Sequence, residues 1–144
     1  MNDGLILLVD DSPDDVVLTK RALRKNNISN EVIVAPDGEE ALRYLLPEGE
    51  AQELPVLILL DISLPKIGGL EVLRLIRADE RTRYLPVVML STSSEQSDIV
   101  ESYGLGANSY VRKPVVFNDF AEAVRVVGLY WLLINQPVTD YRGS

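Results

Sequence analysis

Residues 5–15 read Leu-Ile-Leu-Leu-Val-Asp-Asp-Ser-Pro-Asp-Asp and indicate the fold class most directly. The five leading apolar residues predict a short strand buried on both faces, as in a parallel sheet. The run stops at Asp10 and Asp11, and a helix start follows at once. Ser12 suits the N-cap and Pro13 the first helical position. The segment therefore predicts a strand–helix unit with two acids at the carboxyl end of the strand.

The same alternation continues along the chain and defines its fold class. Further strands are expected over residues 31–35, 56–61, 86–90 and 109–111, and helices over about 13–25, 37–46, 70–78, 93–103 and 118–134. Strands that alternate with helices predict an α/β fold, a five-stranded parallel sheet with five helices on both faces. We expect one domain over residues 1–137 and a loose tail over residues 138–144.

The composition excludes several kinds of chemistry. The 144 residues include no Cys and no His, so disulfides, thiolate or imidazole metal ligands and Ser-His-Asp catalysis are excluded. Oxygen ligands alone suit Mg²⁺, Ca²⁺ or Mn²⁺. The net charge of −8 disfavours direct binding to nucleic acid or anionic lipid. Without a signal peptide or a spanning segment, a soluble cytoplasmic protein without membrane contact is expected.

Polar residues stand at or just after the ends of four of the five predicted strands. They are Asp10 and Asp11, Asp61, Ser91 and Thr92, and Lys113. Because ligands of parallel sheets bind at the carboxyl ends of the strands, these side chains are expected to gather at one edge. Each residue alone reads more simply as a turn residue, a helix cap or a surface lysine. The ordered set favours a divalent cation that offsets the repulsion among the acids.

Five motifs carry a resemblance to a known family. They are Leu-Val-Asp-Asp-Ser at 8–12, Leu-Leu-Asp-Ile-Ser-Leu-Pro at 59–65, Gly68-Gly69, Leu-Ser-Thr-Ser at 90–93 and Lys113-Pro114. With them the chain resembles the CheY-like receiver domain of two-component response regulators, from Leu5 to about Ile134. The resemblance implies a flavodoxin/CheY-like sheet with the strand order 2-1-3-4-5.

The resemblance also implies a role for each site residue. Asp61 would be the phosphoacceptor, and the donor would be a phosphohistidine of a sensor histidine kinase, since this chain has no His. Lys113 and Ser91 would contact phosphoryl oxygens, and Thr92 would govern access to them. The ligands of Mg²⁺, for which Mn²⁺ or Ca²⁺ could substitute, would be Asp10, Asp11, Asp61 and the backbone carbonyl of Ser63.

Further expectations concern the backbone near Lys113 and how a phosphoryl group becomes a signal. Ser91 and Tyr110 resemble the hydroxyl and aromatic switch pair of the family, and the bond before Pro114 is expected to be cis. No output domain is expected, so the signal would pass through protein contact. The apolar stretch 124–134 predicts a homodimer through the last helix, and the ending resembles single-domain regulators paired with bacterial phytochromes.

Four other functions compete with a terminal switch. A phosphotransfer intermediate in a phosphorelay would use the same site. A haloacid-dehalogenase-like phosphatase needs a second acid where this chain has Ser63, so we expect catalysis only of the chain's own phosphorylation and dephosphorylation. A nucleotide- or flavin-binding module wants a Gly-rich turn where residues 11–14 read Asp-Ser-Pro-Asp. A pseudo-receiver that only binds partners would not need the full set of acids and Lys113.

Overall fold

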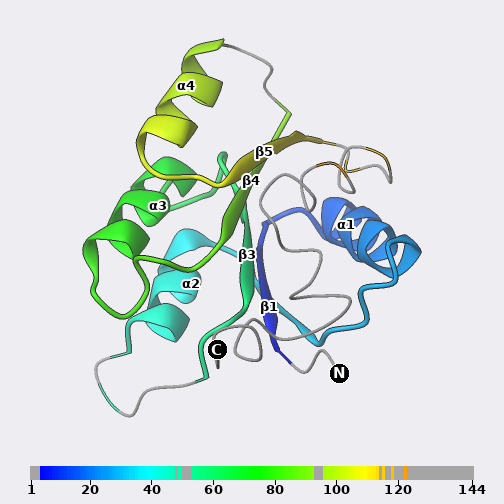
Figure 1. Ribbon diagram of the computed structural model, residues 1–144, viewed down its shortest axis with the longest axis horizontal. Coiled ribbons are helices and arrows are strands. Elements are labelled where there is room, and N and C mark those ends of the chain that lie inside the picture. The colour runs from blue at the N-terminus through cyan, green and yellow to red at the C-terminus, as the bar shows by residue number, and fades with distance from the viewer. Residues whose placement is uncertain are drawn as a thin grey trace, which may run out of the picture.

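The apolar runs pair into one parallel sheet in the computed structural model (Figure 1). Its strands are β1 (Ile6–Val9), β2 (Val32–Ala35), β3 (Leu57–Asp61), β4 (Val87–Ser91) and β5 (Ser109–Arg112). They lie in the order β2-β1-β3-β4-β5, and every neighbouring pair is parallel. The structure describes residues 4–47, 49, 53–92, 96–113, 115, 118 and 122. The predicted order 2-1-3-4-5 is confirmed, and the reversal of strand order lies between β1 and β3, where such sheets bind ligands.

The helices divide between the two faces of the sheet, as Figure 1 shows. They are α1 (Pro13–Lys25) on one face, and α2 (Gly38–Leu45), α3 (Gly69–Ala78) and α4 (Gln96–Gly104) on the other. Apart from residues 118 and 122, the predicted helix over residues 118–134 lies outside the described residues, as does the predicted tail over 138–144. Within the described part of the chain, no helix has the length and apolarity needed to cross a membrane.

Side-chain caps fix where the first two helices begin. The Ser12 hydroxyl accepts the Asp15 N–H at 3.3 Å, and the Asp37 carboxylate accepts the Glu40 N–H at 2.8 Å. Each cap satisfies one of the free N–H groups of a helix start. Because α1 starts so soon after β1, its first turn lies directly beside the carboxyl end of that strand.

The core consists of two apolar layers, one on each side of the sheet. One layer contains Leu8, Leu59, Leu90 and Val111 with the inner face of α1. The other contains the neighbouring strand residues Leu7, Leu60 and Met89 with α2 and α3. Successive residues of a strand point to opposite faces, so a continuous apolar run supplies both layers. The same alternation decides which face each residue at the strand ends can reach.

Candidate functional site

Strand periodicity brings the predicted acids and the lysine to the same face. Asp10 comes two residues after Leu8, Asp61 two after Leu59, and Lys113 two after Val111. All three apolar residues belong to the layer under α1. The residues at the strand ends therefore continue that layer with charged groups. Asp10 and Asp61 are 2 % and 3 % exposed, and Lys113 is 8 % exposed.

A local turn orients each of the two buried carboxylates. Asp10 Oδ1 accepts the Ser12 N–H at 3.0 Å, and Asp61 Oδ1 accepts the Ser63 N–H at 3.2 Å. Both are Asx-type contacts with the backbone two residues further on. The turns leave the second oxygen of each carboxylate directed toward the space between β1, β3 and β5. There Asp10 Oδ2 and Asp61 Oδ2 each lie 3.1 Å from Lys113 Nζ.

Three carboxylates form a group that could hold a cation. Asp10, Asp11 and Asp61 each offer one oxygen, and these oxygens lie within 4.8 Å of one another. Asp10 and Asp61 are buried, whereas Asp11 is exposed. Asp10 Oδ2 is buried without a hydrogen bond of good geometry, although it faces the Lys113 ammonium. A buried oxygen with spare acceptor capacity beside two other carboxylates fits a hard divalent cation with oxygen ligands.

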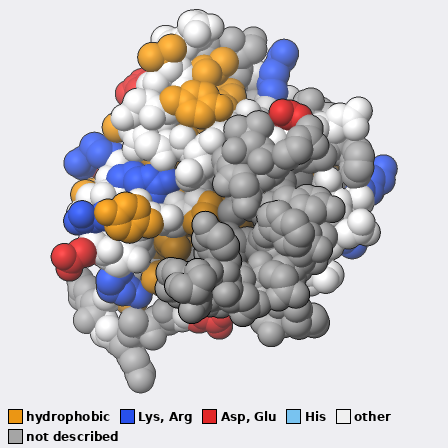
Figure 2. Space-filling model, in the orientation of Figure 1, with side chains coloured by type: hydrophobic (Ala, Val, Ile, Leu, Met, Phe, Trp, Pro, Cys, Tyr) orange, Lys and Arg blue, Asp and Glu red, His pale blue; other side chains and the backbone are white. Residues whose placement is uncertain are grey.

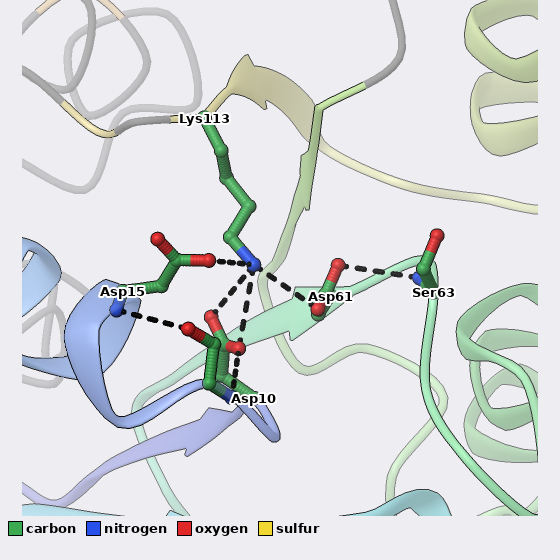
Figure 3. A network of polar contacts seen from close by, with 6 residues as sticks. Asp10, Asp15, Asp61, Ser63 and Lys113 are labelled. Carbon is green, nitrogen blue, oxygen red and sulfur yellow. Dashed lines mark hydrogen bonds and ion pairs between the residues drawn. The ribbon is translucent and has the colours of Figure 1, made fainter.

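The Lys113 ammonium lies at the centre of the site, between β1, β3 and the first turn of α1 (Figure 3). Its side chain is 5 % exposed. Besides Asp10 and Asp61 it contacts Asp15 Oδ2 at 2.8 Å. The backbone N–H of Lys113 also donates to the Ser91 carbonyl at 2.7 Å, which connects the backbone at the end of β5 to β4.

Asp15 is a member of the site that sequence reasoning missed. An acid in the first turn of a helix would ordinarily be assigned only a favourable interaction with the positive end of the helix dipole. The structure places its carboxylate against Lys113, with 27 % of the side chain exposed. Asp15 could have been predicted only from the position of α1. This helix covers the same face of the sheet that Asp10, Asp61 and Lys113 reach.

The electrostatic environment shifts the pKa of both central groups. Burial raises the pKa of Asp61, and the nearby Asp10 charge raises it further, against the opposing effect of Lys113 and the Ser63 N–H. Burial alone would lower the pKa of Lys113. Hydrogen bonds to Asp15 and Asp10, with the charge of Asp61, outweigh that effect and raise the Lys113 pKa. Lys113 is therefore a permanent cation of the site.

The raised pKa of Asp61 predicts that Asp61→Asn stabilises the fold. When a carboxyl group has a higher pKa in the folded state than in the unfolded chain, the folded protein becomes less stable as pH rises through the two pKa values. Asn mimics the protonated side chain and avoids that loss. We expect a higher free energy of unfolding for Asp61→Asn at pH 7 in EDTA, by an amount that shrinks toward pH 3. Urea unfolding across this pH range measures the difference.

Divalent cations provide the control for that experiment. A cation bound by the acidic group stabilises only the folded protein, and it needs the Asp61 carboxylate. Adding Mg²⁺ should therefore stabilise the wild type more than Asp61→Asn. The difference between their free energies of unfolding should become smaller. A variant that is less stable than the wild type at pH 7 in EDTA would contradict this account of the Asp61 environment.

Gly69 allows α3 to begin directly against the end of β3. A Cβ at this position would lie 2.1 Å from the Asp61 carbonyl oxygen and 2.7 Å from the Cα of Ile62. The Gly69 N–H donates to the Ile62 carbonyl at 2.9 Å. The neighbouring Gly68 has no such restriction, because its nearest atom would be 4.0 Å away. The close approach at Gly69 fixes the backbone that carries the Asp61 side chain.

The other predicted site residues occupy different surroundings. Ser91 is 1 % exposed at the end of β4, two residues after Met89, and so continues the layer under α2 and α3. Tyr110 packs against the same layer, whereas Thr92 is exposed after the strand. Ser63 is exposed in the turn after β3, with its N–H on Asp61. Pro114, with the predicted cis bond, lies outside the described residues.

Comparisons with known proteins agree with this fold. The bacteriophytochrome response regulator RtBRR is 47 % identical, with 94 % of this chain and 84 % of that chain covered and a TM-score of 0.82. Response regulator Rcp1 of Synechocystis sp. is 38 % identical over 130 residues, 89 % of this chain and 88 % of Rcp1. The structure of its Mn(2+)-bound form has a TM-score of 0.73 at 36 % identity and covers 91 % of this chain and 95 % of that chain.

A third relative was solved in a phosphorylated form. It is the cyanobacterial phytochrome response regulator RcpA, 38 % identical, with 92 % of this chain and 94 % of that chain covered and a TM-score of 0.74. The model of the response regulator receiver domain itself matches residues 6–125. That match spans most of the chain and includes Asp10, Asp61 and Lys113. The chain belongs to the response regulator receiver family of two-component signalling.

Proposed function

We propose that this receiver domain accepts a phosphoryl group from a sensor histidine kinase on Asp61 and signals by protein contact. The observation that carries the proposal is the contact of the buried Asp61 carboxylate with Lys113 Nζ at 3.1 Å, beside an acidic group suited to a cation. In the transfer, the phosphorus–nitrogen bond of the phosphohistidine breaks and a bond from an Asp61 oxygen to phosphorus forms. The kinase histidine keeps the electron pair of the broken bond.

The acidic group would hold Mg²⁺, for which Mn²⁺ or Ca²⁺ could substitute. Asp10, Asp11 and Asp61 would be its side-chain ligands, together with the backbone carbonyl of Ser63. When bound, the cation would supply positive charge to offset that of the acids and the phosphoryl oxygens. The oxygens within 4.8 Å of one another support this assignment, as does the Mn(2+)-bound form of the relative Rcp1.

The residues of the chain itself would divide the remaining work. Asp61 is the nucleophile, and its burial limits the water that could compete with it or hydrolyse the product. Lys113 compensates the negative charge of the phosphoryl oxygens, which is the main demand of phosphoryl transfer. Ser91 would donate its hydroxyl to one of those oxygens, and Thr92 would limit access from solvent. The phosphorylated relative RcpA supports the chemistry.

Mass spectrometry with a small phosphodonor tests the proposal. After incubation with acetyl phosphate and Mg²⁺, the wild type should gain about 80 Da, one phosphoryl group on a carboxylate. Asp61→Asn should gain none. The control is Asp37→Asn, which removes another buried carboxylate but keeps an N-capping side chain at α2. An adduct on Asp61→Asn equal to that on the wild type, or no adduct on the wild type, would overturn the assignment.

The signal would pass from the site to α4 and β5. We propose that Ser91 and Tyr110 act as the switch pair, with Tyr110 turning as Ser91 moves toward the phosphoryl group. Support comes from their shared packing layer and from apolar surface nearby. Val100 and Tyr103 of α4 are 59 % and 49 % exposed, and Figure 2 shows hydrophobic side chains on the surface over this helix. Exposed apolar groups of this kind favour protein contact.

The identity of the partners extends the same proposal. Similarity to the phytochrome response regulators favours a bacterial phytochrome kinase as the donor. We propose that the chain acts in signalling and that it catalyses only its own phosphorylation and dephosphorylation. A phosphorelay intermediate stays the alternative, because it would use the same site. The homodimer through residues 118–134 also stays a prediction, since these residues lie outside the described set, isolated positions excepted.

A further inference from the structure

Asp15 makes the shortest contact of the Lys113 ammonium. Its Oδ2 lies 2.8 Å from Nζ, whereas the nearest oxygens of Asp10 and Asp61 are each 3.1 Å away. Asp15 reaches the ammonium from the first turn of α1, opposite Asp61 (Figure 3). It does not belong to the group of acids that could share a cation, which contains Asp10, Asp11 and Asp61 among the described residues. Its contact in the site is therefore with the lysine.

The number of N–H groups on the ammonium limits how many oxygens it can serve. A lysine ammonium has three N–H donors. Three carboxylates surround Nζ in this structure, those of Asp10, Asp15 and Asp61. Once phosphorylated, Asp61 would no longer present a carboxylate to the ammonium, and one phosphoryl oxygen could take the donor that it leaves. A second phosphoryl oxygen could receive an N–H only if Asp10 or Asp15 gave up its contact.

Asp15 is the acceptor that can leave at the lowest cost. Its side chain is 27 % exposed, against 0 % for Asp10 and 5 % for Asp61. A carboxylate released from Lys113 at this position could be hydrated, whereas a buried carboxylate would lose its partner without water to replace it. Its place in the first turn of α1 also favours a free negative charge, because of the helix dipole.

We propose that Asp15 is a positioning residue that holds the Lys113 ammonium before phosphorylation and then competes with the phosphoryl group for it. This inference rests on the proposed function of Asp61. Asp15 keeps the lysine directed into the site while Asp61 is free. It weakens the hold of the site on a phosphoryl group, because a second phosphoryl oxygen can bind Lys113 only where the Asp15 contact is given up. Asp15 thus shifts the balance toward the unphosphorylated form.

The consequence is a gain of affinity when the Asp15 charge is removed. Asp15→Asn should bind beryllofluoride, an anion that mimics a phosphoryl group on a carboxylate, about fivefold more tightly than the wild type in Mg²⁺. Asp15→Ala, which removes the acceptor altogether, should bind at least as tightly as Asp15→Asn. Asp15→Glu keeps the charge and should return the affinity toward that of the wild type. Titration followed by ¹⁹F NMR measures the dissociation constants.

Two controls separate the lysine contact from simpler effects. Asp14→Asn removes the same charge from the same helical turn, but Asp14 is exposed and makes no contact with Lys113 that the structure describes. It should leave the affinity within twofold, a limit set by coupling energies between groups that do not touch. In a Lys113→Gln background, Asp15→Asn should no longer tighten binding, because the competition needs the ammonium.

Each possible result supports or overturns the proposal. Unchanged or weaker binding by both Asp15→Asn and Asp15→Ala, with an unfolding midpoint like that of the wild type, would overturn it. An equal gain in Asp14→Asn, or an undiminished gain in the Lys113→Gln background, would assign the effect to general charge repulsion and also overturn it. Failure of the wild type to bind beryllofluoride would overturn the proposed function together with this inference.

Discussion

Lys113→Met is expected to lower the free energy of unfolding by about 3 kcal/mol at pH 7.5 in EDTA, the cost of removing one partner from a buried ion pair. The ammonium contacts two carboxylates whose side chains are 0 % and 5 % exposed, those of Asp10 and Asp61. No other cation among the described residues contacts either of them. Methionine would fill the space of the side chain but would leave both charges uncompensated. Urea unfolding monitored by circular dichroism measures the change.

The pH and metal dependence of this loss identify its cause. Without Lys113 the pKa of Asp61 should rise further, so the folded state binds a proton more readily than the unfolded chain. The stability of Lys113→Met then falls more steeply than that of the wild type as pH rises. The difference between their free energies of unfolding should be smaller in acid and larger above neutrality. Saturating Mg²⁺ should restore part of the loss.

Lys66→Met is the matched control for Lys113→Met. Lys66 pairs with Asp37 at 3.5 Å and with Glu39 at 3.3 Å, but its side chain is 58 % exposed. Exposed ion pairs contribute little, so a loss below about 1 kcal/mol is expected. Equal losses for the two lysine variants would contradict the central role of Lys113 in the buried charge network.

Gly69→Ala is expected to cost about 3 kcal/mol, the upper end of the usual cost of overpacking. The added Cβ would lie 2.1 Å from the Asp61 carbonyl oxygen. The obstacle is backbone within the sheet, which cannot rotate away as a side chain could. Either α3 or the end of β3 must shift, and a shift of β3 would displace Asp61. We therefore also expect slower phosphorylation by acetyl phosphate in the folded variant.

Gly68→Ala serves as the control one residue earlier. Gly68 is the N-cap of α3 with φ −67°, an ordinary value for alanine, and the nearest atom would be 4.0 Å from its Cβ. Replacement of an N-cap glycine by alanine should cost under about 1 kcal/mol. If thermal unfolding gave similar losses for both variants, the close approach of α3 to Asp61 would not explain the need for glycine.

The architecture was predictable because local signals agreed with the tertiary structure. Apolar runs such as Leu5–Val9 fit only strands covered on both sides, and the caps at Ser12 and Asp37 begin helices where the sequence placed them. The strand order came from the resemblance, since the apolar pattern of β1 and β3 does not say which strands are neighbours. The other described boundaries differ by about one residue, as at Gly69, where α3 begins before the predicted Leu70, whereas the predicted start of α4 at residue 93 lies outside the described residues.

The site was predictable as far as strand ends determine it. Asp10 and Lys113 come directly after β1 and β5, and Asp61 is the last residue of β3, so their meeting needed only a parallel sheet. Asp15 could not be found in this way, because its contact depends on how α1 lies across the sheet. The burial of each charged side chain could not be predicted either. Asp10 is buried and Asp11 is exposed, although they are adjacent in the sequence.

The alternation of faces along the strands limits how this protein can change in length. Deletion of one residue between Leu57 and Asp61 would turn the acidic side chain toward α2 and α3 and bring an apolar neighbour to Lys113. The connection between α3 and β4, residues 79–86, runs at the opposite end of β4 from the site and carries no such restriction. Tolerated insertions and deletions should therefore cluster in connections of that kind. Those within the strands should arise only in compensated pairs.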